Sequence, residues 1–377
     1  MLIGVPKEIK NHEYRIGLTP AGVNELVAHG HQVIVEHDGG AAVGFDNQQY
    51  VDAGAEIIDS AAEIFKRAEM IIKVKEPQPE ECKQLRPEQL LFTYLHLAPD
   101  PQQTQLLVDS GATCVAYETV TDGRGGLPLL APMSEVAGRM SIQAGAHQLE
   151  KAQGGNGMLL GGVPGVEPAK VLVIGGGVVG VNAATMAVGM GAEVTILDRS
   201  LPRLRELDNQ FGGRIKCIYS TRDAVEQYAL AADLVIGAVL VPGAAAPRLV
   251  SKDLISRMKP GSVVVDVAID QGGCFETSHA TTHQQPTYVV DDVVHYCVAN
   301  MPGGVARTAT MALTNATLPF ALALADKGAE QAMLDDKHLL QGLNVYRGVV
   351  TNEPVAGALG YAYVAPEQVL LRPHQAA

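Results

Sequence analysis

The sequence of 377 residues predicts an α/β protein built on two mostly parallel sheets. Short apolar runs alternate with helix-like segments, and this alternation occurs twice along the chain. Hydrophobic residues make up 47% of the chain and charged residues only 18%, which favours buried cores over disorder. Strands separated by helices form βαβ units, whose strands run parallel.

The first alternating series covers about 130 residues. We expect strands at Leu2–Val5, Gln32–Glu36, Met70–Val74, Leu90–Leu95 and Thr113–Tyr117, with helices at Pro20–His29, Ser60–Arg67 and Gln102–Ser110. Proline in the first turn supports the helix at Pro20. A longer helix is expected from Ser134, a residue type that caps helix N-termini, to about Lys151.

The second series begins at Lys170. Its expected strands are Val171–Ile174, Glu193–Leu197, Ile215–Tyr219, Leu234–Gly237, Ser262–Val267 and Thr287–Val290. A long apolar helix follows over residues 308–326, and the remaining tail is too short for an ordinary domain. We therefore expect one domain from residues 1–130 plus 308–377 and another from 131–307, with helices near 134–151 and 308–326 crossing between them.

Charge and composition exclude several classes of function. The formal net charge of −13 gives no general electrostatic reason to bind nucleic acid or anionic lipid. The apolar stretch 308–325 contains threonine, asparagine and proline, which makes it too polar for a membrane span. Five scattered cysteines and the absence of a signal-peptide pattern fit a cytoplasmic protein. His279, His283 and His295 lack metal-ligand spacing, so no metal site is predicted.

The strongest local signal is the glycine motif of residues 175–180, which matches G-x-G-x-x-G. Gly175 permits a tight turn after the strand, Gly177 lets the backbone approach a pyrophosphate, and Gly180 lets the next helix pack closely. Asp198 follows at the end of the next strand, where its carboxylate can accept hydrogen bonds from ribose hydroxyls. Its charge favours NAD over NADP, although Arg199 and Arg203 lie nearby. We predict a Rossmann-type dinucleotide site; the alternative is an ordinary glycine-rich turn.

Four charged residues stand out against apolar surroundings. Lys75, His96 and Asp270 each come at the end of a predicted strand, where open α/β sheets bind ligands. Arg15 lies in a polar loop, where its guanidinium could clamp a carboxylate or merely pair with Glu13 or Glu8. Taken singly, each of the other three is better explained as a surface residue at a strand end.

Taken together, these segments resemble the alanine dehydrogenase family, which includes the NAD-binding part of proton-translocating transhydrogenase. The matching segments span nearly the whole chain in order: Gly4–Glu8, Glu13–Pro20, Lys73–Pro77, Leu91–His96, Pro132–Met140, Gly161–Gly165, Asp266–Gly273 and Asn300–Gly303. This resemblance implies a substrate domain in 1–130 plus 308–377 and an NAD-binding domain in 131–307. It also implies a homo-oligomer, a hexamer by family.

The resemblance assigns roles residue by residue. Arg15 and Lys75 match the positions that bind the substrate, and His96 and Asp270 match the catalytic residues. The remaining matches are to cofactor contacts: Ser134, Gly175, Gly177, Val178, Gly180, Asp198, Arg203, Ser220, Val239, Leu240, Val267, Ala268, Ile269, Asp270, Val298, Ala299, Asn300 and Met301. His279 departs from the family, whose members often carry a permanently charged residue there.

The reaction implied is reversible, NAD-dependent oxidative deamination of L-alanine to pyruvate and ammonia. Three alternatives stay open at this point: a transhydrogenase-type NAD-binding subunit, a dehydrogenase for another amino acid, and a protein that binds NAD without catalysis. The first would need a partner chain or membrane segments. The last is disfavoured because Arg15, Lys75, His96 and Asp270 occur together.

Overall fold

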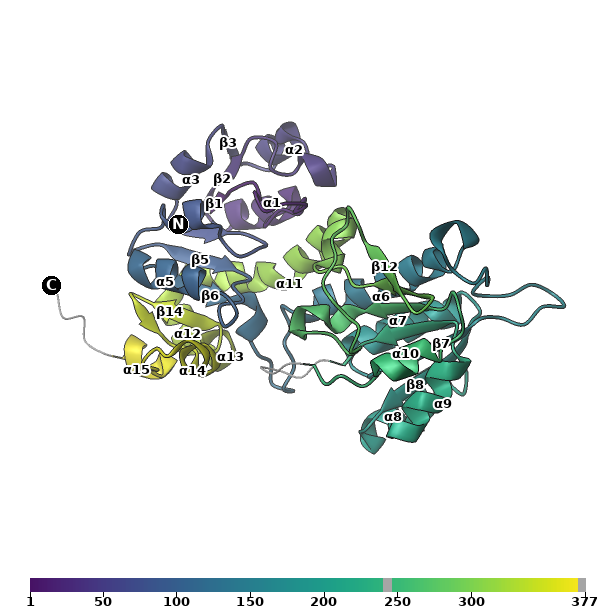
Figure 1. The fold of residues 1–377 in the computed structure, drawn as a ribbon. Helices are drawn as coiled ribbons and strands as arrows, with labels where there is room; N and C mark the ends of the chain where they lie inside the picture. Colours follow the sequence, from purple (N-terminus) through teal and green to yellow (C-terminus); the bar gives the residue numbers. More distant parts are fainter. Residues whose placement is uncertain (240–245, 372–377) are drawn as a thin grey trace. The chain divides into compact units, whose positions relative to one another are not determined.

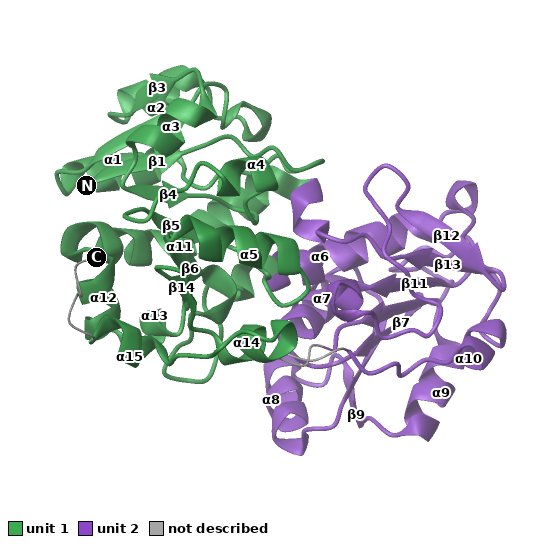
Figure 2. Cartoon of the chain, turned by 60° about the vertical axis from the view of Figure 1, so that its left-hand side comes forward, with its two compact units in different colours: residues 1–133, 305–377 green, residues 134–304 purple. Residues whose placement is uncertain are grey.

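The structure, a computed structural model, describes residues 1–239 and 246–371. The chain divides into two compact units: residues 1–133 with 305–377 form unit 1, and residues 134–304 form unit 2 (Figure 2). The boundaries expected from the sequence, after residues 130 and 307, lie within a few residues of these. The first boundary falls inside one helix, α6 (Ala131–Gln148).

Unit 1 contains an eight-stranded, mostly parallel sheet. Its strands are β1 (Leu2–Val5), β2 (Gln32–Glu36), β3 (Glu56–Ile58), β4 (Met70–Ile72), β5 (Leu90–Thr93), β6 (Thr113–Ala116), β14 (Leu343–Tyr346) and β15 (Val349–Val350). The order is β15-β14-β6-β5-β4-β1-β2-β3 (Figure 1). The C-terminal tail supplies β14 and β15, and β14 pairs antiparallel with β6. The tail therefore extends the sheet that the N-terminal segment begins.

Most helices of unit 1 begin where the sequence provides a capping side chain or a proline, whereas α11 and α12 begin with neither. They are α1 (Pro20–Ala28), α2 (Asn47–Asp52), α3 (Ala61–Arg67), α4 (Pro79–Cys82), α5 (Pro101–Ser110), α11 (Ala306–Lys327), α12 (Ala329–Asp335), α13 (Lys337–Leu340), α14 (Glu353–Leu359) and α15 (Pro366–Leu370), with 3₁₀ turns η1 (Ala41–Val43) and η2 (Tyr117–Thr119). The hydroxyl of Thr19 caps α1, and the carboxylate of Asp100 caps α5. Apolar side chains of α3, α5 and α14 share one core cluster with the strands.

Unit 2 contains a seven-stranded sheet with one antiparallel edge. Its strands are β7 (Lys170–Ile174), β8 (Glu193–Asp198), β9 (Lys216–Tyr219), β10 (Leu234–Gly237), β11 (Val263–Asp266), β12 (Thr287–Val290) and β13 (Val293–Tyr296), in the order β12-β13-β11-β10-β7-β8-β9. Its helices are α7 (Val178–Gly189), α8 (Leu201–Phe211), α9 (Arg222–Ala231) and α10 (Lys252–Ser256), with turns η3 (Lys151–Gln153), η4 (Val267–Gln271) and η5 (Met301–Val305). Side chains of α6, α7 and α8 pack in one core cluster and those of α9 and α10 in another.

The two sheets share one topology, which confirms the predicted α/β class. In unit 1, β3-β2-β1-β4-β5-β6 follows the doubly wound order 3-2-1-4-5-6, and in unit 2, β9-β8-β7-β10-β11-β13 follows the same order. The direction of strand order therefore reverses between β1 and β4 in unit 1 and between β7 and β10 in unit 2. Ligands of such sheets bind outside the strand ends at this switch point.

One local expectation was wrong, and two strands were not predicted. Ser134 lies inside α6 instead of capping it, because Pro132 occupies the first turn and the helix begins at Ala131. Strand β3 was not expected, since its three residues are too few for a periodic signal. Strand β13 was also missed: the adjacent residues Asp291 and Asp292, both with positive φ, form the tight connection between β12 and β13.

The segment Met301–Lys327 is long and apolar enough to cross a membrane by length and composition. Within unit 1, however, α11 buries a face that includes Thr310, Thr314 and Thr317, and it contacts α1 and α12. The hydroxyl of Thr310 on this face accepts a hydrogen bond from the amide of Ile16 at 3.3 Å, so the face packs against the rest of unit 1. We interpret α11 as a core helix of unit 1.

Candidate functional site

The predicted substrate-binding and catalytic residues of unit 1 follow three neighbouring strands, two of which border the switch point. Arg15 is in the connection after β1, Lys75 comes three residues after β4, and His96 comes three residues after β5. These three strands are consecutive neighbours and parallel, so their carboxyl ends meet at one edge of the sheet. The structure therefore brings Arg15, Lys75 and His96 to the same edge of unit 1.

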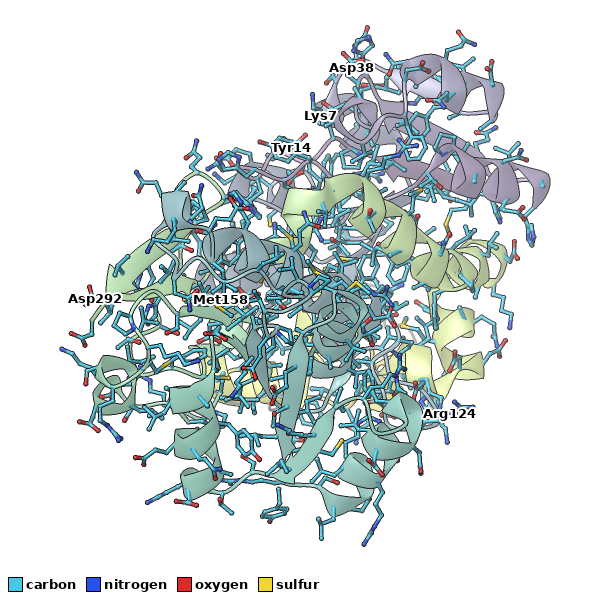
Figure 3. All side chains as sticks on the ribbon, turned by 90° about the vertical axis from the view of Figure 1, so that its right-hand side faces the viewer. Lys7, Tyr14, Asp38, Arg124, Met158 and Asp292 are labelled. Carbon is cyan, nitrogen blue, oxygen red and sulfur yellow. The ribbon has the colours of Figure 1, made fainter. Side chains whose placement is uncertain are left out.

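Arg15 is buried, with 2% of its surface exposed, whereas the adjacent Tyr14 lies at the surface of unit 1 (Figure 3). Its Nε and Nη2 atoms donate to the two carboxylate oxygens of Glu13, each at 2.7 Å, and Nη1 lies 3.1 Å from the sulfur of Met133. Burial disfavours the charged guanidinium, but the bonds and charge of Glu13 outweigh it and raise the pKa of Arg15. Arg15 is thus a fixed cation held by a bidentate partner.

Lys75 is half-buried, and hydrogen bonds fix its backbone on both sides. Its amide donates to Oε1 of Glu8 at 3.2 Å, and its carbonyl accepts from the hydroxyl of Thr93 at 3.0 Å. The ammonium lies 3.7 Å from Glu76, and the nearby Lys75 charge helps to keep the pKa of Glu76 low against the opposing effect of burial. The side chain therefore starts from a rigid point at the end of β4.

His96 has a backbone conformation that side-chain-bearing residues rarely adopt. Its φ is +51°, in the left-handed region. The carboxylate of Glu118 compensates by accepting from the amide of His96 at 2.6 Å and from that of Leu95 at 3.1 Å. The same carboxylate lies 3.9 Å from Nδ1 of His96, and the ring of Tyr94 stacks on the imidazole with centroids 5.8 Å apart. A strained backbone held by local partners is typical of functional positions.

Glu118 was not predicted from the sequence. It lies in η2, directly after β6, the next parallel neighbour of β5. The rule that selected Lys75 and His96, a charged residue following a buried strand, therefore applies to Glu118 as well.

In unit 2, the glycine motif lies at the switch point after β7 and has the geometry that a dinucleotide requires. Gly175 has a φ of +107°, and a Cβ on Gly180 would lie 1.8 Å from the carbonyl oxygen of Gly175. A Cβ on Gly177, in contrast, would meet no atom within 4 Å. Gly177 precedes α7 without a side-chain cap, and Val178 in the first turn is exposed. The turn is therefore closely packed at Gly180 and leaves free space at Gly177, directly before the N-terminus of α7.

Asp198 ends β8 beside this turn. Its Oδ2 accepts from the amide of Gly176 and its Oδ1 from the amide of Ser200, both at 2.8 Å. A carboxylate has about four acceptor sites, so these two bonds leave acceptor capacity for hydroxyl groups. Arg203 donates to the carbonyl of Gly176 at 2.7 Å and to Glu206 at 2.6 Å. Its charge is therefore partly neutralised and tied to the turn.

Asp270 lies in η4, which follows β11, and its side chain is exposed. The end of this segment is anchored by Asp266, whose Oδ2 accepts from the amide of Cys274 at 2.8 Å and from the hydroxyl of Ser278 at 2.5 Å. Burial raises the pKa of Asp266 against the opposing effect of these bonds. Asp266 thereby fixes the loop that carries Asp270.

The other predicted cofactor residues occupy the same unit and mostly the same edge. Ser220 follows β9 and donates its amide to the carbonyl of Asp198 at 2.9 Å; Val239 follows β10; Val267, Ala268 and Ile269 precede Asp270; and Val298, Ala299, Asn300 and Met301 follow β13. Asn300 has a φ of +62°, and Met301 is buried in the core of unit 2. Ser134 lies on α6, and Leu240 lies outside the described residues.

His279, where the family often has a permanent cation, stacks on Tyr288 with ring centroids 3.7 Å apart. Its backbone amide donates to the Tyr288 hydroxyl at 2.9 Å. Among the described residues, no group of three or more histidine, cysteine, aspartate or glutamate side chains is arranged to hold a metal ion.

Family models match almost the whole chain. The N-terminal domain of alanine dehydrogenase/PNT matches residues 4–137, and the C-terminal domain of the same family matches residues 141–353. These two matches extend over both units and include all predicted site residues.

Individual relatives are similar over nearly their full length. The chain is 64% identical to an alanine dehydrogenase of Halomonas elongata, with 97% of this chain and 98% of the relative covered, and 57% identical to one of Bacillus subtilis, with 98% of each covered. A solved L-alanine dehydrogenase structure superposes with a TM-score of 0.93 at 52% identity, covering 96% of this chain and 99% of the other. A transhydrogenase of Sinorhizobium meliloti shares the fold, with a TM-score of 0.80 at 24% identity over 94% and 99%.

Proposed function

The chain belongs to the alanine dehydrogenase family, and from this premise we propose that it catalyses the reversible, NAD-dependent oxidative deamination of L-alanine to pyruvate and ammonia. The near-full-length identity to alanine dehydrogenases supports this reaction. The observation that supports the residue assignments is the location of Arg15, Lys75 and His96 after three neighbouring strands of unit 1, two of which border the switch point. Two cations and an imidazole after the carboxyl ends of neighbouring strands suit an amino-acid substrate. The cations can neutralise its carboxylate, and the imidazole can carry protons to and from its nitrogen.

The glycine turn, α7 and Asp198 are the proposed NAD site. The open space at Gly177 and the uncapped N-terminus of α7 suit the negative pyrophosphate, and the spare acceptor capacity of Asp198 suits a ribose diol. The Asp198 charge would repel a 2′-phosphate, which supports NAD over NADP. When bound, NAD supplies the acceptor for the hydride on Cα of the substrate.

In the proposed mechanism, Arg15 and Lys75 neutralise the substrate carboxylate and fix the orientation of Cα. His96 accepts a proton as the ammonium group of alanine becomes an imine, because imidazole exchanges protons near neutral pH. Asp270 orients the water that adds to this imine. The water loses its second proton to solvent as it adds. His96 then returns its proton to the nitrogen of the carbinolamine and takes up the proton of the hydroxyl group as the C–N bond breaks, so that ammonia leaves and pyruvate remains.

We also infer that the chain forms a homo-oligomer, a hexamer by its resemblance to the family. Its proposed partners are otherwise the small molecules of the reaction. Light scattering of the purified protein would give the mass directly, and a mass equal to one chain at the concentration used for activity would contradict the inference.

A direct test is to mix the purified chain with NAD and one amino acid at a time and to follow NADH by its absorbance. We expect turnover with L-alanine, none with D-alanine, and much weaker turnover when NADP replaces NAD. A protein that binds NAD but forms no NADH with L-alanine would contradict the proposal. Faster turnover with a different amino acid would keep the reaction type and change the substrate.

A further inference from the structure

Three ionisable side chains without a role in the proposed reaction form a buried cluster in unit 1. The ammonium of Lys73 donates to Oε2 of Glu8 and to Oε1 of Glu81, both at 2.8 Å. The side chains of Lys73, Glu8 and Glu81 are exposed by 0%, 2% and 4%. Burying three charges is costly, and apolar residues of similar volume are often at least as stable. Stability alone is therefore a weak reason for this cluster.

The two carboxylates differ in what their second oxygen holds. Oε1 of Glu8 accepts from the amides of Val74 at 2.6 Å and Lys75 at 3.2 Å. Oε2 of Glu81, in contrast, accepts from the amide of Gln78 at 2.7 Å and so caps its own short helix, α4. Glu8 is thus bonded to the residue proposed to bind substrate, whereas Glu81 is not.

The position of Glu8 depends on the connection that also carries Arg15. The preceding residue, Lys7, lies at the surface (Figure 3), while Glu8 points inward from the same loop after β1. The loop and the end of β4 lie on the two sides of the switch point, and the bonds of Glu8 join them. The Glu8 charge also contributes, after Glu13 and Tyr94, to the raised pKa of Arg15, against the opposing effect of burial. Glu8 therefore joins the loop that carries Arg15 to the backbone of Lys75.

We propose that Glu8 is a positioning residue for the substrate: its carboxylate, held by Lys73, fixes the backbone of Lys75 at the switch point. This inference rests on the proposed function, because it assumes that Lys75 binds the substrate. It predicts that loss of the Glu8 carboxylate weakens binding of L-alanine and pyruvate and leaves the affinity for NAD unchanged.

The test compares Glu8→Gln with the matched control Glu81→Gln. Each change replaces one acceptor oxygen by an amide group, and each faces the same Lys73 ammonium. In Glu8→Gln the new NH2 group faces either the Lys73 ammonium or the backbone amides of residues 74 and 75. In Glu81→Gln it faces either Lys73 or the cap of α4. In either orientation, Glu8→Gln breaks one link of the path from Lys73 through residue 8 to the backbone of Lys75, whereas Glu81→Gln leaves this path intact.

We expect Glu8→Gln to raise the KM for L-alanine by about tenfold or more while the KM for NAD stays unchanged. Both variants are expected to lower the melting temperature by similar amounts, because each disturbs the same buried cluster. Glu81→Gln should leave the KM for L-alanine close to that of the unmodified chain. If Glu8→Gln does not fold, Glu8→Asp provides the same test, since it keeps the charge and withdraws the carboxylate by one methylene.

Equal KM values for L-alanine in folded Glu8 and Glu81 variants would overturn the inference, as would a parallel rise in the KM for NAD. Failure of the unmodified chain to turn over L-alanine would instead overturn the proposed function. The two failures are therefore distinguishable.

Discussion

At the scale of single residues, the cations proposed to bind substrate are not isolated charges. Glu13 holds Arg15, Glu8 holds the backbone of Lys75, and Glu118 holds the backbone of His96. The bonds and charge of Glu13 raise the pKa of Arg15 against the opposing effect of burial, whereas Glu8 and Glu118 bind backbone amides and so fix the main chain at Lys75 and His96. The chemistry of this edge therefore depends on carboxylates that need not touch the substrate.

His96→Ala is expected to lower kcat for L-alanine by about 10²- to 10⁴-fold, because the proton carrier is lost. The affinity for NAD should not change, since His96 belongs to unit 1. Steady-state rates and NAD titration measure the two effects. His147→Ala is a suitable control, because His147 is an exposed histidine near the end of α6. Near-normal turnover of folded His96→Ala would remove His96 from its proposed role.

At the scale of elements, two glycines of the turn between β7 and α7 are needed for different reasons. A side chain at Gly180 would strike the carbonyl of Gly175, whereas one at Gly177 would meet only open space. The former glycine therefore serves packing of the helix on the sheet, and the latter leaves room in front of the helix.

Gly177→Ala tests this space. We expect an unchanged melting temperature and a loss of NAD affinity of about tenfold or more, about 1.4 kcal/mol, because the methyl group would occupy the proposed pyrophosphate position. Gly189→Ala is the matched control at the other end of α7, where a Cβ also meets nothing within 4 Å. It should leave NAD binding unchanged and stabilise the helix by about 0.5–1 kcal/mol. Unchanged NAD affinity in Gly177→Ala would contradict the proposed site.

Elements with a strong local pattern could be predicted from the sequence, and those defined by tertiary pairing could not. Buried runs such as Leu2–Val5 and Leu234–Gly237 were predicted to the residue, because parallel strands covered on both faces are continuously apolar. Strand β3 has three residues and forms only beside β2. Helix α6 begins at Ala131, with Pro132 in its first turn, and not at Ser134. Both proline and serine are typical of helix starts, so the sequence alone did not decide between them.

The site shows the same division. The glycine motif and the charged residues after β4 and β5 were visible from the sequence, because each follows a recognisable strand. The buried contacts of Glu8 with Lys73 join residues 65 positions apart and have no local signal. The pairing of Arg15 with Glu13 was an open alternative that only the folded loop decides.

At the scale of the whole molecule, burial of thiols links stability to alkaline pH. Cys82, Cys114, Cys274 and Cys297 are buried and free. Burial raises the pKa of Cys297 from an ordinary value of 9.0 to about 11, and that of Cys274 to about 12. In the unfolded chain these thiols ionise near their ordinary pKa, while in the folded chain they stay protonated. The corresponding stability is therefore full below about pH 9 and is lost as the pH rises toward the folded pKa.

In Cys297→Ala, the free energy of unfolding should fall less steeply as the pH rises above about 9. Each buried thiol contributes a slope of about 1.4 kcal/mol per pH unit, so Cys297 accounts for about 3 kcal/mol between its two pKa values. Denaturant unfolding at several pH values above about 8 measures the slope. Cys217→Ala is the control, because Cys217 is only half-buried and should change the slope less. An identical slope in the Cys297 variant and the unmodified chain would contradict the linkage.

The central claim is that the hydride on Cα of L-alanine passes to NAD on this chain. The most direct measurement uses L-alanine deuterated at Cα and determines by mass spectrometry where the deuterium goes. We predict that the reduced cofactor carries one deuterium and that pyruvate and ammonia form in equal amounts with it. Pyruvate formed without deuterium in the reduced cofactor, or no reduced cofactor at all, would contradict the claim.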